Sequence, residues 1–393
     1  MLSKNINFKN FNINKNSSFK KYLKTSSINL KSLLKEDSEL IKSLTSTYKY
    51  SFKKKLIKKF VKAPILRLIG MGGSILGTEA IYNFLNFKIK KKVLFVNNLK
   101  RQQETINLPK KLVNIIISKS GNTLETILNS NLLIQEDHKN IFITENKDSY
   151  LKKLAQNLKA EIVNHNNFIG GRYSVLSEVG MLPVELMGLS EKKFKQFNHL
   201  VKSKRFISSL VNNVSNIICL QKNKKFNSII INYDEESESL FKWYQQLVAE
   251  SLGKKSSGIL PIVSTMPKDN HSTMQLYLDG QKNSFYTFFY VDEKNILKIN
   301  KKNILSSHNY LKDKGVKEIL FAQKKATEKI FFKKKIPFRS FEVFNRSEES
   351  LGELFSFFIL ETILVGRALN INPFDQPSVE LIKQETKKIL IRS

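Results

Sequence analysis

Short apolar runs of strand length alternate with stretches of helical periodicity along the first half of the chain. The strand-length runs are Ile65–Ile69, Val93–Val96, Asn114–Ile117 and Ile141–Thr144. The helical stretches are Thr78–Phe87, Thr123–Gln135 and Ser149–Leu158. Because strands that alternate with helices form a parallel sheet whose faces the helices cover, this pattern predicts βαβ units.

The same alternation returns in the second half, after a helical passage over Glu191–Lys222. The expected strands there are Ser228–Ile231, Leu260–Val263, Ser284–Tyr290 and Arg339–Val343. The expected helices lie around Ser239–Glu250, Ser272–Leu278 and Val316–Lys333. We therefore predict two α/β layers in tandem, joined through the passage.

Two more helices are expected near the C-terminus, a buried one over Glu349–Leu369 and a terminal one over Val379–Ile391. The helix-breaking sequence Asn-Pro-Phe-Asp-Gln-Pro at 372–377 separates them. The predicted fold is α/β, with two tandem doubly wound parallel-sheet domains and flanking N- and C-terminal helices. The expected boundaries are a basic helical extension over 1–60, domains over 61–195 and 196–375, and a C-terminal helix over 376–393.

Charge adds a question about partners. The 66 Lys and Arg residues against 34 Asp and Glu give a net charge of +32, which a nucleic acid, an anionic membrane or an acidic substrate would attract. The lysine runs at 53–59, 88–92 and 333–335 contain no interleaved base-stacking aromatics, and the excess is spread over almost every segment. We expect a solvated lysine coat, with no specific nucleic-acid binding and no membrane binding.

The chain offers little for redox or metal chemistry. Cys219 is the single cysteine, so neither an intramolecular disulfide nor a paired-cysteine metal site is expected, and a cytoplasmic location fits best. No apolar run approaches the roughly 18 residues that a spanning helix requires.

Two glycine- or hydroxyl-rich turns join a strand to a helix. Gly70–Gly77 has the close backbone approach of an anion site, yet such a turn is also a common packing device. Ile75 and Thr78 stand where a dinucleotide fingerprint and a P-loop would need Gly and Lys, so both nucleotide patterns fail. The turn at 118–126, Ser-Lys-Ser-Gly-Asn-Thr-Leu-Glu-Thr, crowds hydroxyls and one ammonium at a helix start, which favours a phosphate monoester over a plain N-cap.

Other candidates are weaker when taken singly. Paired glycines precede Arg172 and allow a sharply turned, fixed guanidinium, although a surface arginine is the simpler alternative. Gln246 and Glu250 share one helix face, where Glu250 is either a general base or an ordinary exposed carboxylate. Nothing local distinguishes His271 or Lys383 from a structural histidine and a surface lysine.

Taken together and in this order, the segments resemble the phosphoglucose isomerase family, whose members are built from two sugar-isomerase (SIS) domains. The matching segments are Gly70–Gly77, Ser118–Thr126, Gly170–Pro183, Trp243–Ser251, Lys268–Gly280 and Asn372–Glu380 followed by Lys383. They extend over positions 70 to 383, while residues 1–62 carry no motif that matches.

The resemblance implies roles for these residues. Glu250 would move a proton between C2 and C1, Arg172 would stabilise the cis-enediolate, and His271 with Lys383 would assist ring opening. The phosphate and sugar contacts would come from Gly73, Ser74, Ser118, Lys119, Ser120, Thr123, Gln246 and Gln376. Family members are usually homodimers in which this histidine reaches the neighbouring site, and they need no metal or organic cofactor.

Three alternatives stay open on the sequence. A dual phosphoglucose and phosphomannose isomerase would share the architecture, because selectivity at C2 depends on the shape of the pocket. A sugar-phosphate sensor would keep the phosphate turns and lack the chemistry, but it would not need Glu250, Arg172, His271 and Lys383 together. A nucleic-acid-binding protein is suggested by the charge alone.

Overall fold

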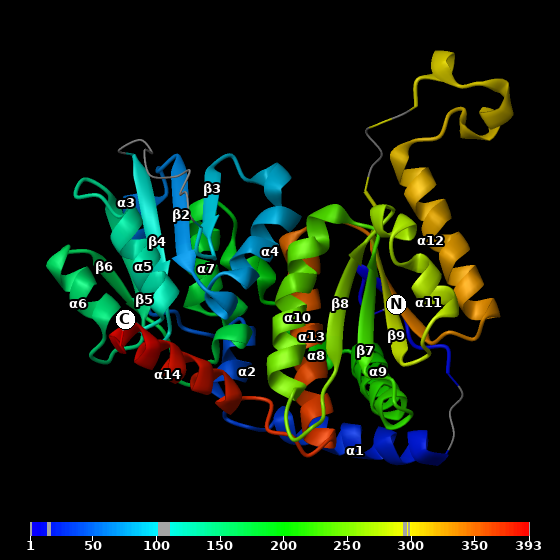
Figure 1. Ribbon diagram of the computed structural model, residues 1–393, viewed down its shortest axis with the longest axis horizontal. Helices are drawn as coiled ribbons and strands as arrows, with labels where there is room; N and C mark the ends of the chain where they lie inside the picture. The colour runs from blue at the N-terminus through cyan, green and yellow to red at the C-terminus, as the bar shows by residue number, and fades with distance from the viewer. Residues whose placement is uncertain (1, 14–16, 101–110, 294–296, 298, 393) are drawn as a thin grey trace.

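The first sheet is five-stranded and wholly parallel, in the order β3-β2-β4-β5-β6 (Figure 1). In the computed structural model, which describes residues 2–13, 17–100, 111–293, 297 and 299–392, its strands are β2 Ile65–Gly70, β3 Lys92–Val96, β4 Leu112–Ile117, β5 Lys139–Thr144 and β6 Glu161–Asn164. Every residue of β4 is buried, as a central parallel strand covered on both faces requires. Four of these strands were predicted from the sequence, and β6 was not.

The helices that accompany the first sheet are α3 Lys54–Phe60, α4 Leu76–Phe84, α5 Leu124–Leu133, α6 Tyr150–Asn157 and α7 Glu178–Met187. The chain leaves β2 toward β3 on one side, whereas it leaves β4 toward β5 on the other. A crevice therefore opens between the carboxyl ends of β2 and β4, the usual ligand position in doubly wound sheets.

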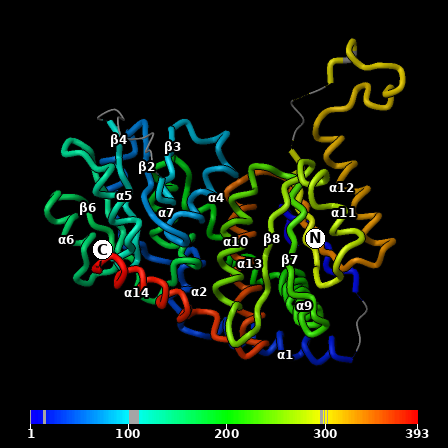
Figure 2. The backbone as a smooth tube through the Cα atoms, viewed as in Figure 1, coloured from blue at the N-terminus to red at the C-terminus, as the bar shows by residue number. Residues whose placement is uncertain are grey.

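The second sheet has the order β1-β10-β9-β7-β8. Its strands are β1 Ile6–Lys9, β7 Asn227–Asn232, β8 Leu260–Thr265, β9 Ser284–Val291 and β10 Phe338–Val343. Four of them are parallel, and β1 is antiparallel to β10 at the edge. Residues 165–226, drawn in green in Figure 2, lead the chain from the first sheet to the second.

The helices of this second half are α8 Phe197–Lys202, α9 Lys204–Lys222, α10 Glu238–Leu252, α11 Met274–Asp279, α12 Val316–Lys333 and α13 Glu348–Ala368. Helix α13 is buried over almost its whole length, which confirms the predicted apolar helix. Helix α10 packs against both α13 and α4, so it joins the two halves. Helix α14, Pro377–Arg392, ends the chain with every residue exposed or half-exposed.

The N-terminal segment corrects one expectation. Residues 1–60 were predicted as a helical extension, but β1 completes the second sheet through its pairing with β10. After β1, α1 Ser17–Leu33 packs against α9 and α13, and α2 Glu39–Leu44 follows. β1 and α1 are therefore integral parts of the second half, and the side chains of Ile6 and Phe8 join the main core.

Among the described residues, none of the helices is both long enough and apolar enough to cross a membrane.

Candidate active site

Two turns meet at the crevice between β2 and β4. Gly70 at the end of β2 is paired with Ile117 at the end of β4, and a Cβ added to Gly70 would lie 2.9 Å from the Ile117 carbonyl oxygen and 3.2 Å from Ser74 Cβ. The two chain segments thus approach too closely for any side chain at position 70. Ser74 thus lies on the same side of Gly70 as the end of β4, which leads into the turn that begins at Ser118.

Hydroxyl groups organise the turn between β4 and α5. Ser118 Oγ and Thr123 Oγ1 lie 2.9 Å apart, and Ser118 Oγ also accepts from the Gly121 N–H at 3.2 Å. Gly121 has a φ of +67°, where a side chain would be strained. Ser120 Oγ accepts from the Asn122 N–H at 3.2 Å. The turn therefore gathers three hydroxyl groups at the start of α5, and a helix N-terminus favours a bound anion.

Lys119 supplies the positive charge of this turn. Its Nζ donates to the Asn167 carbonyl oxygen at 2.8 Å and lies 3.6 Å from Glu145 Oε1. Burial lowers the pKa of Lys119, the charge of Glu145 opposes this shift, and the positive charge of Arg172 adds to the lowering. A bound anion would offset the positive charge that this partly buried ammonium brings to the turn.

Glu250 is held by two neighbours near the end of α10. Gln246 Nε2 donates to Glu250 Oε1 at 2.9 Å, and Arg172 Nη1 donates to Glu250 Oε2 at 3.3 Å. Arg172 is 1% exposed and lies in a 3₁₀ turn over Gly171–Leu176. The carboxylate keeps a side-chain exposure of 30%, so it is oriented by the protein and still accessible.

Close glycine packing brings α10 and the arginine turn to the β2–α4 turn. A Cβ on Gly73 would lie 2.2 Å from the carbonyl carbon of Gly171, so the two turns touch through their backbones. A Cβ on Gly72, whose φ is +51°, would lie 2.7 Å from Gln246 Nε2. These glycines allow the β2–α4 turn, the arginine turn and α10 to converge on one point.

Gln246 also offers an unused acceptor. Its Oε1 is buried and has no hydrogen-bond partner among the described residues. Gln246 and Glu250 together line a cavity of about 530 Å³, which also contains Leu76, Glu79 and Asn97. A sugar hydroxyl in this cavity would donate to Gln246 Oε1. A buried acceptor without a donor lowers stability by about 1–3 kcal/mol.

Gln376 lies at the same point, but Lys383 does not. Gln376 Oε1 accepts from Arg172 Nη1. Lys383, two turns along α14, is exposed and pairs with Glu380 Oε2 at 3.2 Å. Both line a separate cavity of about 330 Å³ at the start of α14, and no described contact joins Lys383 to Glu250. The structure thus unites Arg172, Glu250, Gln246 and Gln376 and leaves Lys383 at the periphery.

His271 lies at the opposite end of α10 from Glu250. It is exposed in the 3₁₀ turn Lys268–His271, which follows β8. At the end of β8, Thr265 Oγ1 donates to Glu238 Oε2 at 3.0 Å, and Glu238 begins α10. Twelve helical residues separate Glu238 from Glu250, which corresponds to roughly 18 Å along the axis. Within one chain the structure does not bring His271 to the carboxylate.

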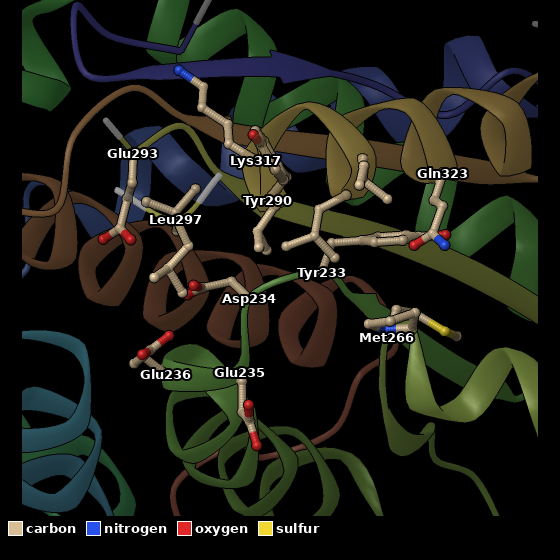
Figure 3. A pocket seen from close by; sticks show the side chains of 15 residues that line it. Tyr233, Asp234, Glu235, Glu236, Met266, Tyr290, Glu293, Leu297, Lys317 and Gln323 are labelled. Atoms are coloured by element: carbon tan, nitrogen blue, oxygen red, sulfur yellow. The ribbon is translucent and has the colours of Figure 1, made fainter. Parts of the chain in front are cut away.

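A third cavity, of about 570 Å³, lies at the carboxyl edge of the second sheet (Figure 3). Carboxylates of Asp234, Glu235, Glu236 and Glu293 border it, and Arg346 pairs with Asp234 at 2.5 Å and also contacts Glu293. This rim of negative charge would repel a phosphate, so the cavity does not compete with the crevice of the first sheet as a sugar-phosphate site.

This chain is similar to known proteins over most of its length. The family model of phosphoglucose isomerase matches residues 24–392. A glucose-6-phosphate isomerase of Methanocaldococcus jannaschii is 31% identical over 83% of each chain, and one of Mycoplasmopsis pulmonis is 32% identical over 86% of this chain and 84% of its own.

The chain belongs to the phosphoglucose isomerase family. The resemblance predicted from the sequence is confirmed, together with the enzyme class of an aldose–ketose isomerase of glucose 6-phosphate. Among solved structures, a hypothetical protein of Thermus thermophilus shares the fold with a TM-score of 0.81 at 22% identity, over 95% of this chain and 96% of its own. A Chlamydia trachomatis glucose-6-phosphate isomerase matches with a TM-score of 0.68 at 19% identity, over 86% and 71%.

Sequence reasoning missed two residues that lie against Arg172. Ser251 Oγ accepts from Arg172 Nε at 2.8 Å, and Tyr173 Oη lies 2.8 Å from Ser251 Oγ. Each directly follows a residue that had been singled out, Glu250 and Arg172 respectively. A hydroxyl beside each charged residue was a signal in the sequence, but it is too common a pattern to be selected without the tertiary contact.

Proposed function

We propose that this chain interconverts glucose 6-phosphate and fructose 6-phosphate through a cis-enediolate, with Glu250 as the base that moves the proton between C2 and C1. The observation that supports this most is the carboxylate itself, oriented by Gln246 at 2.9 Å and Arg172 at 3.3 Å beside a cavity of about 530 Å³. A proton transfer between adjacent carbons needs one carboxylate on one face of a planar intermediate.

Arg172 would stabilise the negative charge that develops on the enediolate oxygens. Its guanidinium is buried, where a charge interaction is stronger than in water. The phosphate would bind to the turn that contains Ser118, Lys119 and Thr123, with Ser120 and Ser74 as further donors. Binding the phosphate away from the reacting carbons positions the sugar for the proton transfer. Gly73, Gln246 and Gln376 would line the sugar.

Ring opening would be assisted by His271 of the partner subunit in a cytoplasmic homodimer. His271 is exposed, and its turn follows the strand end whose Thr265 contacts Glu238, which lies roughly 18 Å along the α10 axis from Glu250 of the same chain. An exposed histidine that is distant from its own site is available to a neighbouring site. Lys383 would join it after a local rearrangement of α14, which carries it seven residues beyond Gln376.

A coupled assay of the conversion of glucose 6-phosphate to fructose 6-phosphate tests the activity. Conversion is expected with no added metal and unchanged by a chelator. Failure of the wild-type chain to convert either sugar would overturn the proposal.

Complementation between two inactive variants tests the shared site. Glu250→Gln and His271→Ala chains, each with a different affinity tag, are co-expressed and the hybrid dimer is isolated. If histidine acts across the interface, one of the two sites has both groups and the hybrid has about half of the wild-type activity. If histidine acts within its own chain, both sites are incomplete and the hybrid is as inactive as its parents. A hybrid of Glu250→Gln with wild type is the matched control.

A further inference from the structure

Every N–H group of the Arg172 guanidinium is already donated within the chain. Nε donates to Ser251 Oγ at 2.8 Å. Nη1 donates to Glu250 Oε2 at 3.3 Å and to Gln376 Oε1. Nη2 donates to the carbonyl oxygens of Pro373 at 2.7 Å and Asp375 at 3.0 Å. A guanidinium has five N–H donors in a rigid plane, so these contacts determine its orientation completely. A substrate oxygen can reach Arg172 only at Nη1, where the partners are two half-exposed or exposed side chains.

The other two nitrogens, Nε and Nη2, donate to a buried hydroxyl and to backbone carbonyl oxygens, which have little freedom to reorient. Ser251 and Tyr173 are both fully buried, and Tyr173 Oη donates to the Pro373 carbonyl oxygen at 3.0 Å. Ser251 Oγ accepts from Arg172 Nε, and Tyr173 Oη lies within hydrogen-bond distance of both Ser251 Oγ and the Pro373 carbonyl oxygen. When Tyr173 donates to Pro373 and Ser251 donates to Tyr173, all three hydrogen bonds form together.

Burial keeps this chain in one protonation state. The pKa of Tyr173 is raised by burial, with Arg172 and Ser251 opposing the shift, so its hydroxyl remains a donor near neutral pH. Removing either hydroxyl leaves a buried partner with an unused donor or acceptor, which is more costly than the bond itself is favourable. The guanidinium also lies 5.2 Å from the centre of the Tyr173 ring.

The same chain fixes the segment before α14. The Tyr173 ring contacts Phe374 with centroids 5.9 Å apart, and Lys254 Nζ pairs with Asp375 Oδ1 at 2.7 Å. Residues 373–375 thus receive bonds from Arg172, Tyr173 and Lys254 together. The position of Gln376, which follows directly, depends on these contacts.

We propose that Ser251 and Tyr173 are positioning residues for Arg172. The hydrogen-bond chain through their hydroxyls holds the guanidinium with its Nη1 edge toward the sugar, so that the charge of the enediolate meets a donor that needs no reorientation. This inference rests on the proposed role of Arg172 and extends it to two residues that do not touch the substrate.

Tyr173→Phe and Ser251→Ala are tested in the wild-type and in an Arg172→Lys background. In the wild type, each is expected to lower kcat about tenfold while KM for glucose 6-phosphate changes less than about twofold, because the phosphate turn is untouched. In the Arg172→Lys background, a further Tyr173→Phe change is expected to alter kcat less than about twofold, since lysine has no planar fork to orient. Tyr233→Phe is the matched control, because Tyr233 is equally buried and its hydroxyl lies 2.9 Å from the Thr327 hydroxyl, far from Arg172.

A second measurement uses an anionic mimic of the enediolate, a five-carbon aldonic acid 5-phosphate, against inorganic phosphate. Inhibition by the mimic should weaken in step with kcat in both variants, whereas inhibition by phosphate should stay constant. Equal losses of kcat in both backgrounds, or a loss confined to KM, would overturn the inference. If Tyr173→Phe does not fold, the comparison of Ser251→Ala with Ser251→Thr tests the inference. Threonine keeps the hydroxyl, so Ser251→Thr should have a kcat close to that of the wild type. Absence of isomerase activity in the wild type would instead refute the proposed function.

Discussion

Raising the pH from about 7 to about 9 should stabilise this protein through one buried lysine. Lys195 is 8% exposed, and its ammonium donates to the carbonyl oxygens of Ser43 and of Leu176, which ends the turn containing Arg172. Its Nζ lies 5.2 Å and 5.0 Å from the ring centres of Tyr48 and Tyr50. Burial lowers the pKa of Lys195 to about 7 from an ordinary value of 10.5, with Glu191 and Glu178 opposing the shift.

The sign follows from proton binding. Between the folded and unfolded pKa values the unfolded chain holds more protons at Lys195 than the folded chain does, so the free energy of unfolding rises with pH across that window. For a single group with these two pKa values, the gain from about pH 7 to about pH 9 is about 2 kcal/mol. The Lys195→Met variant cannot titrate at this position and should lack the gain.

Urea unfolding of the wild type and of Lys195→Met at about pH 7 and about pH 9 measures this gain in the free energy of unfolding. The pH-dependent increase in the free energy of unfolding should be about 2 kcal/mol larger for the wild type than for Lys195→Met. The neighbouring exposed Lys192→Met variant is the control, and its increase should equal that of the wild type. Equal increases in the wild type and Lys195→Met would show that the two carbonyl groups and the tyrosine rings keep the ammonium charged, and the reasoning from burial would be wrong.

The remaining predictions concern the reaction. Glu250→Gln should lower the isomerisation rate by about a hundredfold or more while sugar-phosphate binding persists, and exchange of the C2 proton in heavy water should fall in parallel; near-normal exchange would assign the base to another carboxylate. Ser118→Ala combined with Thr123→Ala should raise KM for phosphorylated sugars and weaken inhibition by inorganic phosphate, because two hydroxyls 2.9 Å apart are removed from the turn; unchanged phosphate inhibition would move the anion site elsewhere. His271→Ala should impair a cyclic hexose 6-phosphate far more than a four-carbon aldose 4-phosphate that cannot form the ring, and equal losses of deuterium uptake from solvent would leave His271 a structural residue.

Local signals were enough to predict most of the elements. Val316–Lys333 forms a helix with the predicted limits, and β4 differs from the prediction by two residues at its start. Elements that lack a strong local pattern were missed, such as β6, whose four residues are only partly buried at the edge of the sheet. A short edge strand needs less apolar surface than a central one, so its sequence carries a weaker signal.

The residues of the candidate site also differ in how far the sequence could predict them. The phosphate turn was recognisable because its hydroxyls, glycine and lysine lie within six consecutive positions, where backbone geometry alone brings them together. The partners of Arg172 were not, because Ser251 is 79 positions away from it in the chain and Pro373 is 201 positions away. Contacts of that kind depend on how α10 and the C-terminal segment pack.

The sequence by itself determined most of the strands and helices from Ile65 onward, the turns that glycine makes possible, and the family to which the chain belongs. These features follow from periodicity and conformational preference within a few consecutive residues, and such preferences do not depend on distant parts of the chain. Only the tertiary structure decided that Ile6–Lys9 pairs with β10, that α10 places Glu250 and His271 at opposite ends, and that one arginine joins three distant segments. Such choices depend on burial and on the pairing of polar groups across the whole chain, and no short stretch of sequence contains both partners.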